Sequence, residues 1–184
     1  MIKPTNARHD KLELRLADEV DIESIKNLMN LAISELQKPY LTPAQIESSF
    51  LAMGLDTQLI EDKTYFCVWA GDILVGCGGW SRRTTLYGGN HTSGRDANLL
   101  DPATDRARIR AMYTHPDYTR LGIGRLIIDA SEQAAMSEGF KSLEMAATLA
   151  GRDFYLRCGY EIEREWEDKN GPVPVPLLTM VKNI

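Results

Sequence analysis

The chain has 184 residues, 43% of them hydrophobic, which suits a single domain over residues 1–184 with one core of ordinary size. Acidic residues outnumber basic ones by 26 to 21, and the net charge of -5 argues against a positive field that would hold DNA or an anionic membrane, so any anion site must be local. The three widely separated cysteines lack a CxxC spacing, and neither a signal-peptide core nor a run of about 20 apolar residues is present, so we expect a soluble cytoplasmic protein without disulfides or structural zinc.

The first predicted elements are a strand and a long amphipathic helix. Leu12, Leu14 and Leu16 alternate with charged residues, which is typical of a half-buried strand. Asp18 is suited to cap the helix that follows, and Pro39 lies just beyond the end of that helix. The apolar residues that recur at helical spacing are Ile22, Ile25, Leu28, Met29, Ile33 and Leu36.

A second helix is predicted from its capping signal. Thr42-Pro43-Ala44-Gln45 combines a capping box with proline at the first helical position, and the helix is expected to run to Gly54. Its predicted inward residues are Ile46, Phe50 and Met53.

A hairpin and a long loop follow. Residues 64–70 and 73–80 are strand candidates, and Gly71-Asp72 between them predicts an antiparallel hairpin. Residues 81–105 are polar and show no clear periodicity, so we expect a flexible flap over a binding site, with plain disorder as the open alternative.

The next strand leads into the most informative motif of the chain. Residues 106–113 alternate between arginine and apolar side chains up to the break at His115-Pro116. After Gly122 a helix is expected, closed by Gly139. Its predicted apolar face is Leu126, Ile127, Ala130 and Ala134.

The last predicted elements complete a mixed fold. Leu143, Met145 and Ala147 indicate a strand, and a short helix carrying Phe154, Tyr155 and Cys158 ends at Gly159. Residues 160–166 and 177–181 are the final strands, joined by a proline-rich loop. The order βααββ, loop, βαβαββ predicts an α/β or α+β domain with about seven strands and about four helices.

The stretch from Arg120 to Arg125 is a candidate anion site. A helix whose first turn contains Gly122 and Gly124 presents unpaired N–H groups at the positive end of its dipole, with no side chain to keep a phosphate away. Arg120 and Arg125 could add charge-assisted hydrogen bonds. From this stretch alone, a tight turn with two solvated arginines remains the alternative.

Two other phosphate motifs fit less well. The chain has no Gly-Lys followed by Ser or Thr, as a P-loop would need. Ile127 takes the place of the third glycine of a dinucleotide fingerprint, although Glu144 stands where that motif has its ribose-binding acid. The interpretation as a nicotinamide-dependent enzyme is therefore weakened, but it stays open.

Two segments together resemble the GCN5-related N-acetyltransferase (GNAT) superfamily. Residues 109–116, followed by Arg120-Leu121-Gly122-Ile123-Gly124 and its helix, are similar to the acetyl-CoA motif of that family, commonly written Arg/Gln-x-x-Gly-x-Gly/Ala. Counted back from the glycines, the leading position falls on Thr119, one residue before Arg120. Residues 154–160 resemble the Tyr-x-x-x-Gly-Phe/Tyr segment of the family, and the resemblance extends from Leu12 to Val181.

This resemblance implies a mostly antiparallel sheet in which the fourth and fifth strands splay apart around acetyl-CoA, with no metal. It implies that the pyrophosphate rests on the helix N-terminus, that the pantetheine arm pairs with the fourth strand, and that Tyr155 protonates the departing thiolate. The implied cofactor contacts are Met112, Tyr113, Thr114, Arg120, Leu121, Gly122, Ile123, Gly124 and Arg125. Thr148 stands about where the family often has an asparagine.

The roles of several other residues are left open. Glu47, Glu144 and His115 can each be imagined as a base, and we assign that role to none of them. Arg106, Arg108 and Arg110 could bind an anionic acceptor, although pairing with nearby acids explains them better. The aromatic residues that could line an acceptor pocket or belong to the core are Tyr40, Trp69, Trp80 and Tyr87.

The predicted function is transfer of an acetyl group from acetyl-CoA to a primary amine of a small molecule or a peptide. The alternative from another class is a sensor module that binds acyl-CoA without turnover. Nucleic acid and membrane are not expected partners, and a homodimer is possible.

Overall fold

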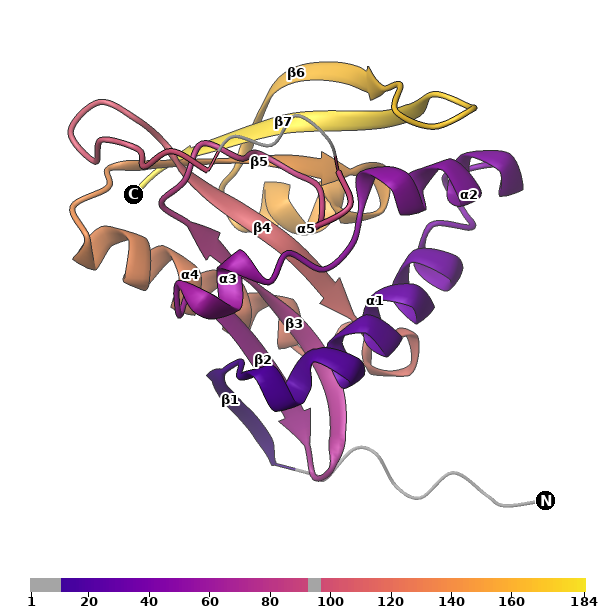
Figure 1. Cartoon of the computed structure of the whole chain (residues 1–184), viewed down its shortest axis with the longest axis horizontal. Helices are drawn as coiled ribbons and strands as arrows, with labels where there is room; N and C mark the ends of the chain where they lie inside the picture. The colour runs from indigo at the N-terminus through magenta and orange to yellow at the C-terminus, as the bar shows by residue number, and fades with distance from the viewer. Residues whose placement is uncertain (1–10, 93–96) are drawn as a thin grey trace.

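The computed structural model describes residues 11–92 and 97–184, which form a seven-stranded sheet with helices on both faces (Figure 1). The strands lie in the order β1-β2-β3-β4-β5-β7-β6. Their bounds are β1 Leu12–Leu16, β2 Tyr65–Ala70, β3 Ile73–Ser81, β4 Ala107–Thr114, β5 Ser142–Thr148, β6 Glu161–Asp168 and β7 Val175–Asn183. The helices are α1 Ile22–Leu36, α2 Pro43–Ala52, α3 Gln58–Glu61, α4 Ile123–Ser137 and α5 Arg152–Arg157, with short 3-10 turns η1 Glu19–Asp21, η2 Pro116–Tyr118 and η3 Leu149–Gly151. The predicted fold class is confirmed, and α3 is an addition to it.

The sheet opens between β4 and β5. These two strands are parallel and pair only at Ala107 with Leu143 and at Arg108 with Glu144. Beyond those pairs they diverge, as Figure 1 shows, while β5 continues alongside β7. The rest of the described ladder is antiparallel, so the predicted splay is confirmed.

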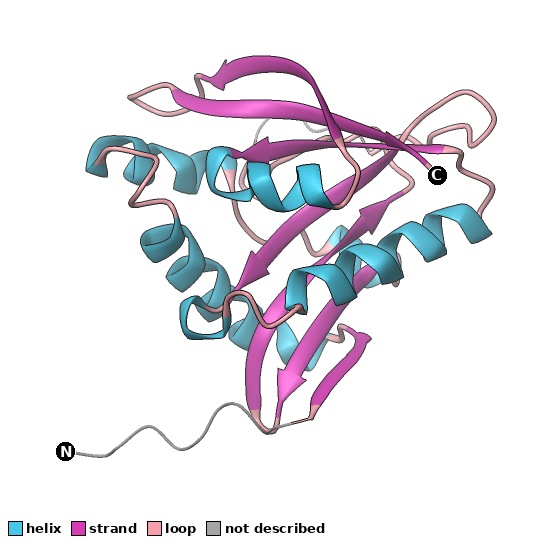
Figure 2. Ribbon diagram, turned by 180° about the vertical axis from the view of Figure 1, so that it is seen from behind, coloured by secondary structure: helices cyan, strands magenta, loops and turns pink. Residues whose placement is uncertain are grey.

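The helices cover the two faces of the sheet and bury separate parts of the core. On one face, Ile25 and Met29 of α1 pack with residues of α3, β2 and β3. On the other, Ile123 and Ile127 of α4 pack against Val68 and neighbouring residues of β2 and β3 (Figure 2). A third cluster joins α4 and α5 to β4, β5 and β7, so α4 and α5 bridge the two halves of the sheet. None of the helices in the described ranges is both long and apolar enough to cross a bilayer.

The inward face predicted for α2 is wrong. Its buried residues are Ser48, Ser49 and Ala52, whereas Ile46 and Phe50 are only half-buried. The reason is close approach of backbone: the Ser48 hydroxyl accepts a hydrogen bond from Val173 N at 3.0 Å, and a Cβ on Gly171 would lie 2.8 Å from Ser48. Small side chains fit between this helix and the loop that joins β6 to β7, so size overrides hydrophobicity there.

The face predicted for α4 is also displaced. Leu126 is exposed, and Ala130 and Ala134 are only half-buried. The buried residues of this helix are Ile123, Ile127, Ile128, Ser131, Glu132 and Ala135. Ser131 is accommodated because its hydroxyl donates to Ile127 O at 2.8 Å, and Glu132 because its carboxylate accepts from Lys182, so two polar residues lie on the inner face and obscure its periodicity.

Residues 83–88 of the loop between β3 and β4 are fastened to the body of the protein. Arg83 donates to the Asp62 carboxylate at 2.6 Å and 2.8 Å and forms an isolated bridge with Leu99. Arg110 of β4 donates to the carbonyls of Thr85 and Gly88, at 2.9 Å and 2.7 Å. Part of the predicted flap, residues 93–96, lies outside the described residues.

The predicted caps form as expected. Thr42 and Gln45 make a reciprocal capping box at the start of α2. Asp18 caps η1, which leads directly into α1, and its N–H donates to the Asp21 carboxylate at 2.8 Å. Gly139 and Gly159 end their helices with positive φ angles of 92° and 87°.

The stability lost on replacing Asp21 should depend on pH in a defined direction. Arg15 donates two hydrogen bonds of 2.7 Å to this buried carboxylate, and they hold the pKa of Asp21 below its usual value. A carboxylate with a lowered pKa stabilises the fold above its unfolded pKa, near 4, and loses that contribution as the pH falls through its folded pKa. We expect Asp21→Asn to cost roughly 1–3 kcal/mol at pH 7 in urea unfolding, and the gap to wild type to close at lower pH.

The matched control is Glu23→Gln, which breaks the exposed Lys26–Glu23 pair. It should cost about 0.5 kcal/mol or less. A gap for Asp21→Asn that stays constant from pH 7 to pH 3 would contradict the role given to its charge.

Candidate functional site

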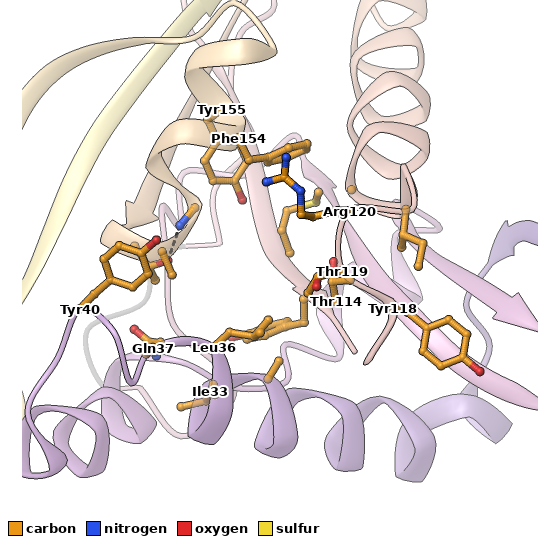
Figure 3. A pocket seen from close by; sticks show the side chains of 18 of the residues that line it. Ile33, Leu36, Gln37, Tyr40, Thr114, Tyr118, Thr119, Arg120, Phe154 and Tyr155 are labelled. Carbon is orange, nitrogen blue, oxygen red and sulfur yellow. Dashed lines mark hydrogen bonds between the residues drawn. The ribbon is translucent and has the colours of Figure 1, made fainter. Parts of the chain in front are cut away.

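A pocket of about 560 Å³ lies where β4, α4, α5 and the C-terminal part of α1 meet. Figure 3 shows Ile33 and Leu36 of α1 along one wall and Phe154 and Tyr155 of α5 on the opposite wall. Arg120 reaches toward Phe154 from the turn before α4. A smaller pocket of about 90 Å³ adjoins it between β4 and β5, and Met53, Met112, Tyr113, Thr148 and Tyr155 line both.

The predicted contacts of the glycine motif gather in the larger pocket. They are Met112, Tyr113, Thr114, Arg120, Gly122, Ile123, Gly124 and Arg125. Leu121 is the exception: it does not line the pocket, and its side chain is 45% exposed. Thr119 lines the pocket as well, so both candidates for the leading position of the motif are present there.

The turn before α4 has the backbone geometry of an anion cradle. Arg120 and Gly122 both adopt left-handed conformations, with φ of 63° and 83°. No described side chain caps the helix at Gly122, so the N–H groups of Ile123, Gly124 and Arg125 have no helical or capping partner in the described chain. A left-handed turn that feeds a helix N-terminus in this way concentrates backbone donors on one concave side.

Glycine is required at positions 122 and 124 for two different physical reasons. A Cβ on Gly122 would meet nothing within 4 Å, so this residue is needed for its φ angle and leaves open space in front of the cradle. A Cβ on Gly124 would lie 2.9 Å from Cζ of Phe154. Gly124 is therefore needed because the α5 ring packs against it, a reason that the motif alone did not indicate.

The arginines around the cradle differ in their partners. Arg125 donates to Arg157 O at 3.2 Å and pairs with the exposed Asp129 at 3.6 Å. Arg120 has no carboxylate partner among the described residues. Its guanidinium is therefore available to meet a ligand beside the cradle.

Tyr155 lies where the two pockets join. Its side chain is 8% exposed, and no group in residues 11–92 or 97–184 forms a hydrogen bond with its hydroxyl. Burial raises the pKa of Tyr155 above its ordinary value. Because burial disfavours the phenolate, the side chain stays protonated at neutral pH.

Local packing fixes the position of that ring. A Cβ on Gly151 would lie 2.6 Å from Cε2 of Tyr155, so the ring rests directly on the backbone at the start of α5. The Thr148 hydroxyl accepts from Gly151 N at 3.3 Å and holds the preceding turn. Thr148 therefore has a capping role that the sequence analysis did not assign.

A bulge in β4 was also missed by the sequence analysis. Ala111 has a φ of 51°, and the register between β3 and β4 shifts around Gly78. The Tyr65 hydroxyl donates to Ala111 O at 2.8 Å, and residues 109–113 line the smaller pocket. A non-glycine residue with positive φ is strained and has no sequence signature, and such strain is often kept at functional sites.

The carboxylates and the histidine considered as bases do not line either pocket. Glu144 pairs with Arg106 at 3.8 Å and with Arg108. The His115 ring accepts from Asp117 N at 3.2 Å and so caps η2. Glu47 is exposed on α2.

Acidic partners account for the three arginines of β4. Arg106 binds Glu163 at 2.9 Å, and Arg108 binds Glu144. Arg110 binds Asp56 at 3.0 Å, with both side chains 2% exposed. Pairing with nearby acids, rather than an anionic acceptor, is the explanation that the structure supports.

The four aromatic candidates separate into pocket and core. Tyr40 lines the larger pocket and Tyr87 the smaller one. Trp80 is buried against Phe140, and Trp69 packs under the Arg15 guanidinium, so neither lines a pocket. Of the described part of the long loop, only residues 86–88 reach a pocket, the smaller one.

The sequence matches the family model described as the acetyltransferase (GNAT) family over residues 25–160. No curated protein matches the chain significantly.

Solved structures share the fold at low sequence identity. A GCN5-related N-acetyltransferase from Rhodopseudomonas palustris is 18% identical with a TM-score of 0.67, covering 94% of this chain and 95% of its own. The PaiA N-acetyltransferase of Thermoplasma acidophilum, in complex with coenzyme A, is 14% identical with a TM-score of 0.62, covering 95% and 99%. YncA of Salmonella typhimurium, with its cofactor acetyl-CoA, is 13% identical with a TM-score of 0.62, covering 94% of each chain.

Gly122→Ala should destabilise the fold through backbone strain alone, since its new methyl group meets no neighbour. Holding alanine in the left-handed region costs roughly 1–2 kcal/mol, to be measured by urea unfolding. Gly71→Ala, at a φ of 59° in the hairpin turn and also free of neighbours, should cost about the same. If Gly122→Ala costs nothing while Gly71→Ala does, the left-handed turn before α4 is not formed.

Proposed function

We propose that this chain, which belongs to the acetyltransferase (GNAT) family, transfers an acetyl group from acetyl-CoA to a primary amine of a small molecule or a peptide. The observation that carries the proposal is the position of the Tyr155 hydroxyl, which has no hydrogen-bond partner among the described residues, where the two pockets join in one cavity with an anion cradle. One group is suited to donate a proton, and the other to hold a phosphate-bearing substrate.

The cradle and the splay fit the two polar parts of acetyl-CoA. We assign its pyrophosphate to the N–H groups at the start of α4, where Gly122 leaves open space and Arg120 is free to add charge-assisted bonds. Residues 112–114 of β4 have no strand partner on the β5 side in the described chain, so their backbone groups can bind the amides of the pantetheine arm. This places the acetyl end near Tyr155.

Acetyl transfer makes one bond and breaks another. The neutral amine attacks the acetyl carbonyl, the C–N bond forms, the C–S bond breaks, and the departing sulfur needs a proton. We assign that proton to the Tyr155 hydroxyl, which water then reprotonates. No Asp, Glu or His in the described ranges lines either pocket, so we propose that the amine loses its own proton to solvent.

The state of the cysteines is the basis for a proposed cellular location. Cys67, Cys77 and Cys158 are free and buried, as suits a protein that works under reducing conditions. We therefore propose that the enzyme acts in the cytoplasm.

Tyr155→Phe tests catalysis against simple binding of acyl-CoA. Loss of the proton donor should lower kcat at least about 100-fold in an assay of coenzyme A release, with the affinity for acetyl-CoA unchanged. The matched control is Tyr160→Phe, which removes the hydroxyl of a buried tyrosine that lines neither pocket. Turnover that survives Tyr155→Phe would remove Tyr155 from the mechanism, and a wild-type protein that binds acetyl-CoA without any turnover would be a sensor.

Thermal unfolding distinguishes acetyl-CoA from a nicotinamide cofactor. We expect acetyl-CoA, but not NADH, to raise the Tm of the wild type. Gly122→Ala should bind acetyl-CoA about 10-fold more weakly, which lowers the stabilisation by about 1.4 kcal/mol or about 3–5 °C for a domain of this size. Gly71→Ala lies far along the chain from the cradle and should keep the full shift, and stabilisation by NADH alone would overturn the assignment.

A further inference from the structure

The two pockets contain positive charge and no negative charge. Arg110, Arg120, Arg125 and Arg157 line them, and no Asp or Glu in residues 11–92 or 97–184 does. Arg110 is neutralised by Asp56 at 3.0 Å. Of the other three, Arg120 and Arg125 belong to the segment of the proposed pyrophosphate site, and Arg157 is the residue whose carbonyl accepts from Arg125. Although the net charge is -5, the described part of the chain therefore presents no carboxylate to an acceptor in either pocket.

The wall that faces Tyr155 is apolar. Ile33 and Leu36 of α1 form it together with Met53, and Figure 3 shows Ile33 and Leu36 across the cavity from Phe154 and Tyr155. Gln37 is the polar residue of this wall; its side-chain nitrogen donates to Ser49 Oγ at 3.3 Å and to Met53 Sδ at 3.5 Å, and its amide oxygen is an acceptor without the formal charge that would neutralise an ammonium group.

Tyr40 ends this wall on the side away from Arg120, as Figure 3 shows. It lies just beyond α1, and half of its side chain is exposed although its ring lines the pocket. An exposed aromatic ring beside aliphatic side chains is suited to bind an apolar group. A cation over a half-exposed ring gains little, so Tyr40 does not replace the missing carboxylate.

We propose that the acceptor is a monoamine whose body is aliphatic or aromatic, seated against Leu36 and Tyr40 with its single amino group toward Tyr155. This inference rests on the proposed acetyltransferase function and names the acceptor class for the same pocket. A second ammonium group on the acceptor would lie against the apolar wall without a counter-ion, in a cavity whose charged side chains repel it. Polyamines and other polycations are therefore poor acceptors.

The first experiment compares two amines of equal length. Hexylamine and 1,5-diaminopentane differ by a terminal methyl group in place of an ammonium group, and 2-phenylethylamine adds an aromatic body. Release of coenzyme A from acetyl-CoA gives kcat/KM for each. We expect hexylamine and 2-phenylethylamine to exceed the diamine by about 10-fold or more, the scale on which an unpaired buried charge discriminates between substrates.

The second experiment introduces a carboxylate into the apolar wall. Leu36→Glu puts an acid on the apolar wall and should shift the ratio of kcat/KM values by about 10-fold toward 1,5-diaminopentane. Leu31→Glu is the matched control, because Leu31 lies on the same helix, is exposed and lines neither pocket, and this variant should keep the wild-type ratio. If Leu36→Glu does not fold, Tyr40→Glu places the same charge at a half-exposed position.

The outcomes separate the two proposals. A wild-type enzyme that acetylates the diamine as well as hexylamine overturns the acceptor class and leaves the acetyltransferase function standing. A ratio that Leu36→Glu and Leu31→Glu change equally also overturns it, because the charge then acts from outside the pocket. If acetyl-CoA binds but neither these amines nor a panel of amino acids and peptides is acetylated, the acetyltransferase function itself fails.

Discussion

The divergence of β4 from β5 is the constraint on which the rest of the site depends. After two residue pairs the strands separate, and the backbone of residues 109–114 loses its partner on the β5 side. Backbone donors and acceptors that are left unpaired in a sheet need water or a ligand. The same opening lets α5 place Tyr155 between the two halves of the sheet, while the core cluster that α4 and α5 share with β4, β5 and β7 keeps those halves together. The opening is thus held in place by packing at its base.

The other side of the opening is ordered by a buried ion pair. Arg110 and Asp56 are each 2% exposed, and two charges so deeply buried are tolerated only when they are paired and hydrogen-bonded. Arg110 supplies further hydrogen bonds to the carbonyls of Thr85 and Gly88, which brings the segment of residues 86–88 to the rim of the smaller pocket. Order in this part of a polar loop therefore comes from a side chain on a distant strand.

Sequence signals that depend only on neighbouring residues predicted most of the fold. Features that depend on a distant partner were not predicted. The strand periods, the capping box at Thr42 and the glycine ends of α4 and α5 depend on neighbouring residues, and they formed as predicted. Which residues of α2 and α4 are buried depends on what packs against each helix. In α2, the close backbone contact at Ser48 buries small side chains in place of the apolar residues that were predicted. Of the nine predicted cofactor contacts, all but Leu121 line the larger pocket, because the glycine motif and the strand before it are continuous in the sequence. The bulge at Ala111 and the wall formed by α1 could not be predicted, since each arises only when β3, β4 and α1 come together.

Low polarity around Tyr155 links the chemistry of the site to its choice of acceptor. Burial disfavours the phenolate and keeps the phenol protonated, which is the form in which it would give the proposed proton to a departing thiolate. A carboxylate beside it would attract cationic acceptors, but it would also compete for the phenolic proton through a hydrogen bond and would hold an incoming amine in its charged, unreactive form. Among the described residues the pocket has no acidic lining and offers an apolar wall, so the energy that binds the proposed acceptor would come from its body, and its amino group would stay free to become neutral. On the proposed function, an amine that must lose its charge is favoured by an apolar lining, and among the described residues that lining leaves no counter-ion for a second positive charge.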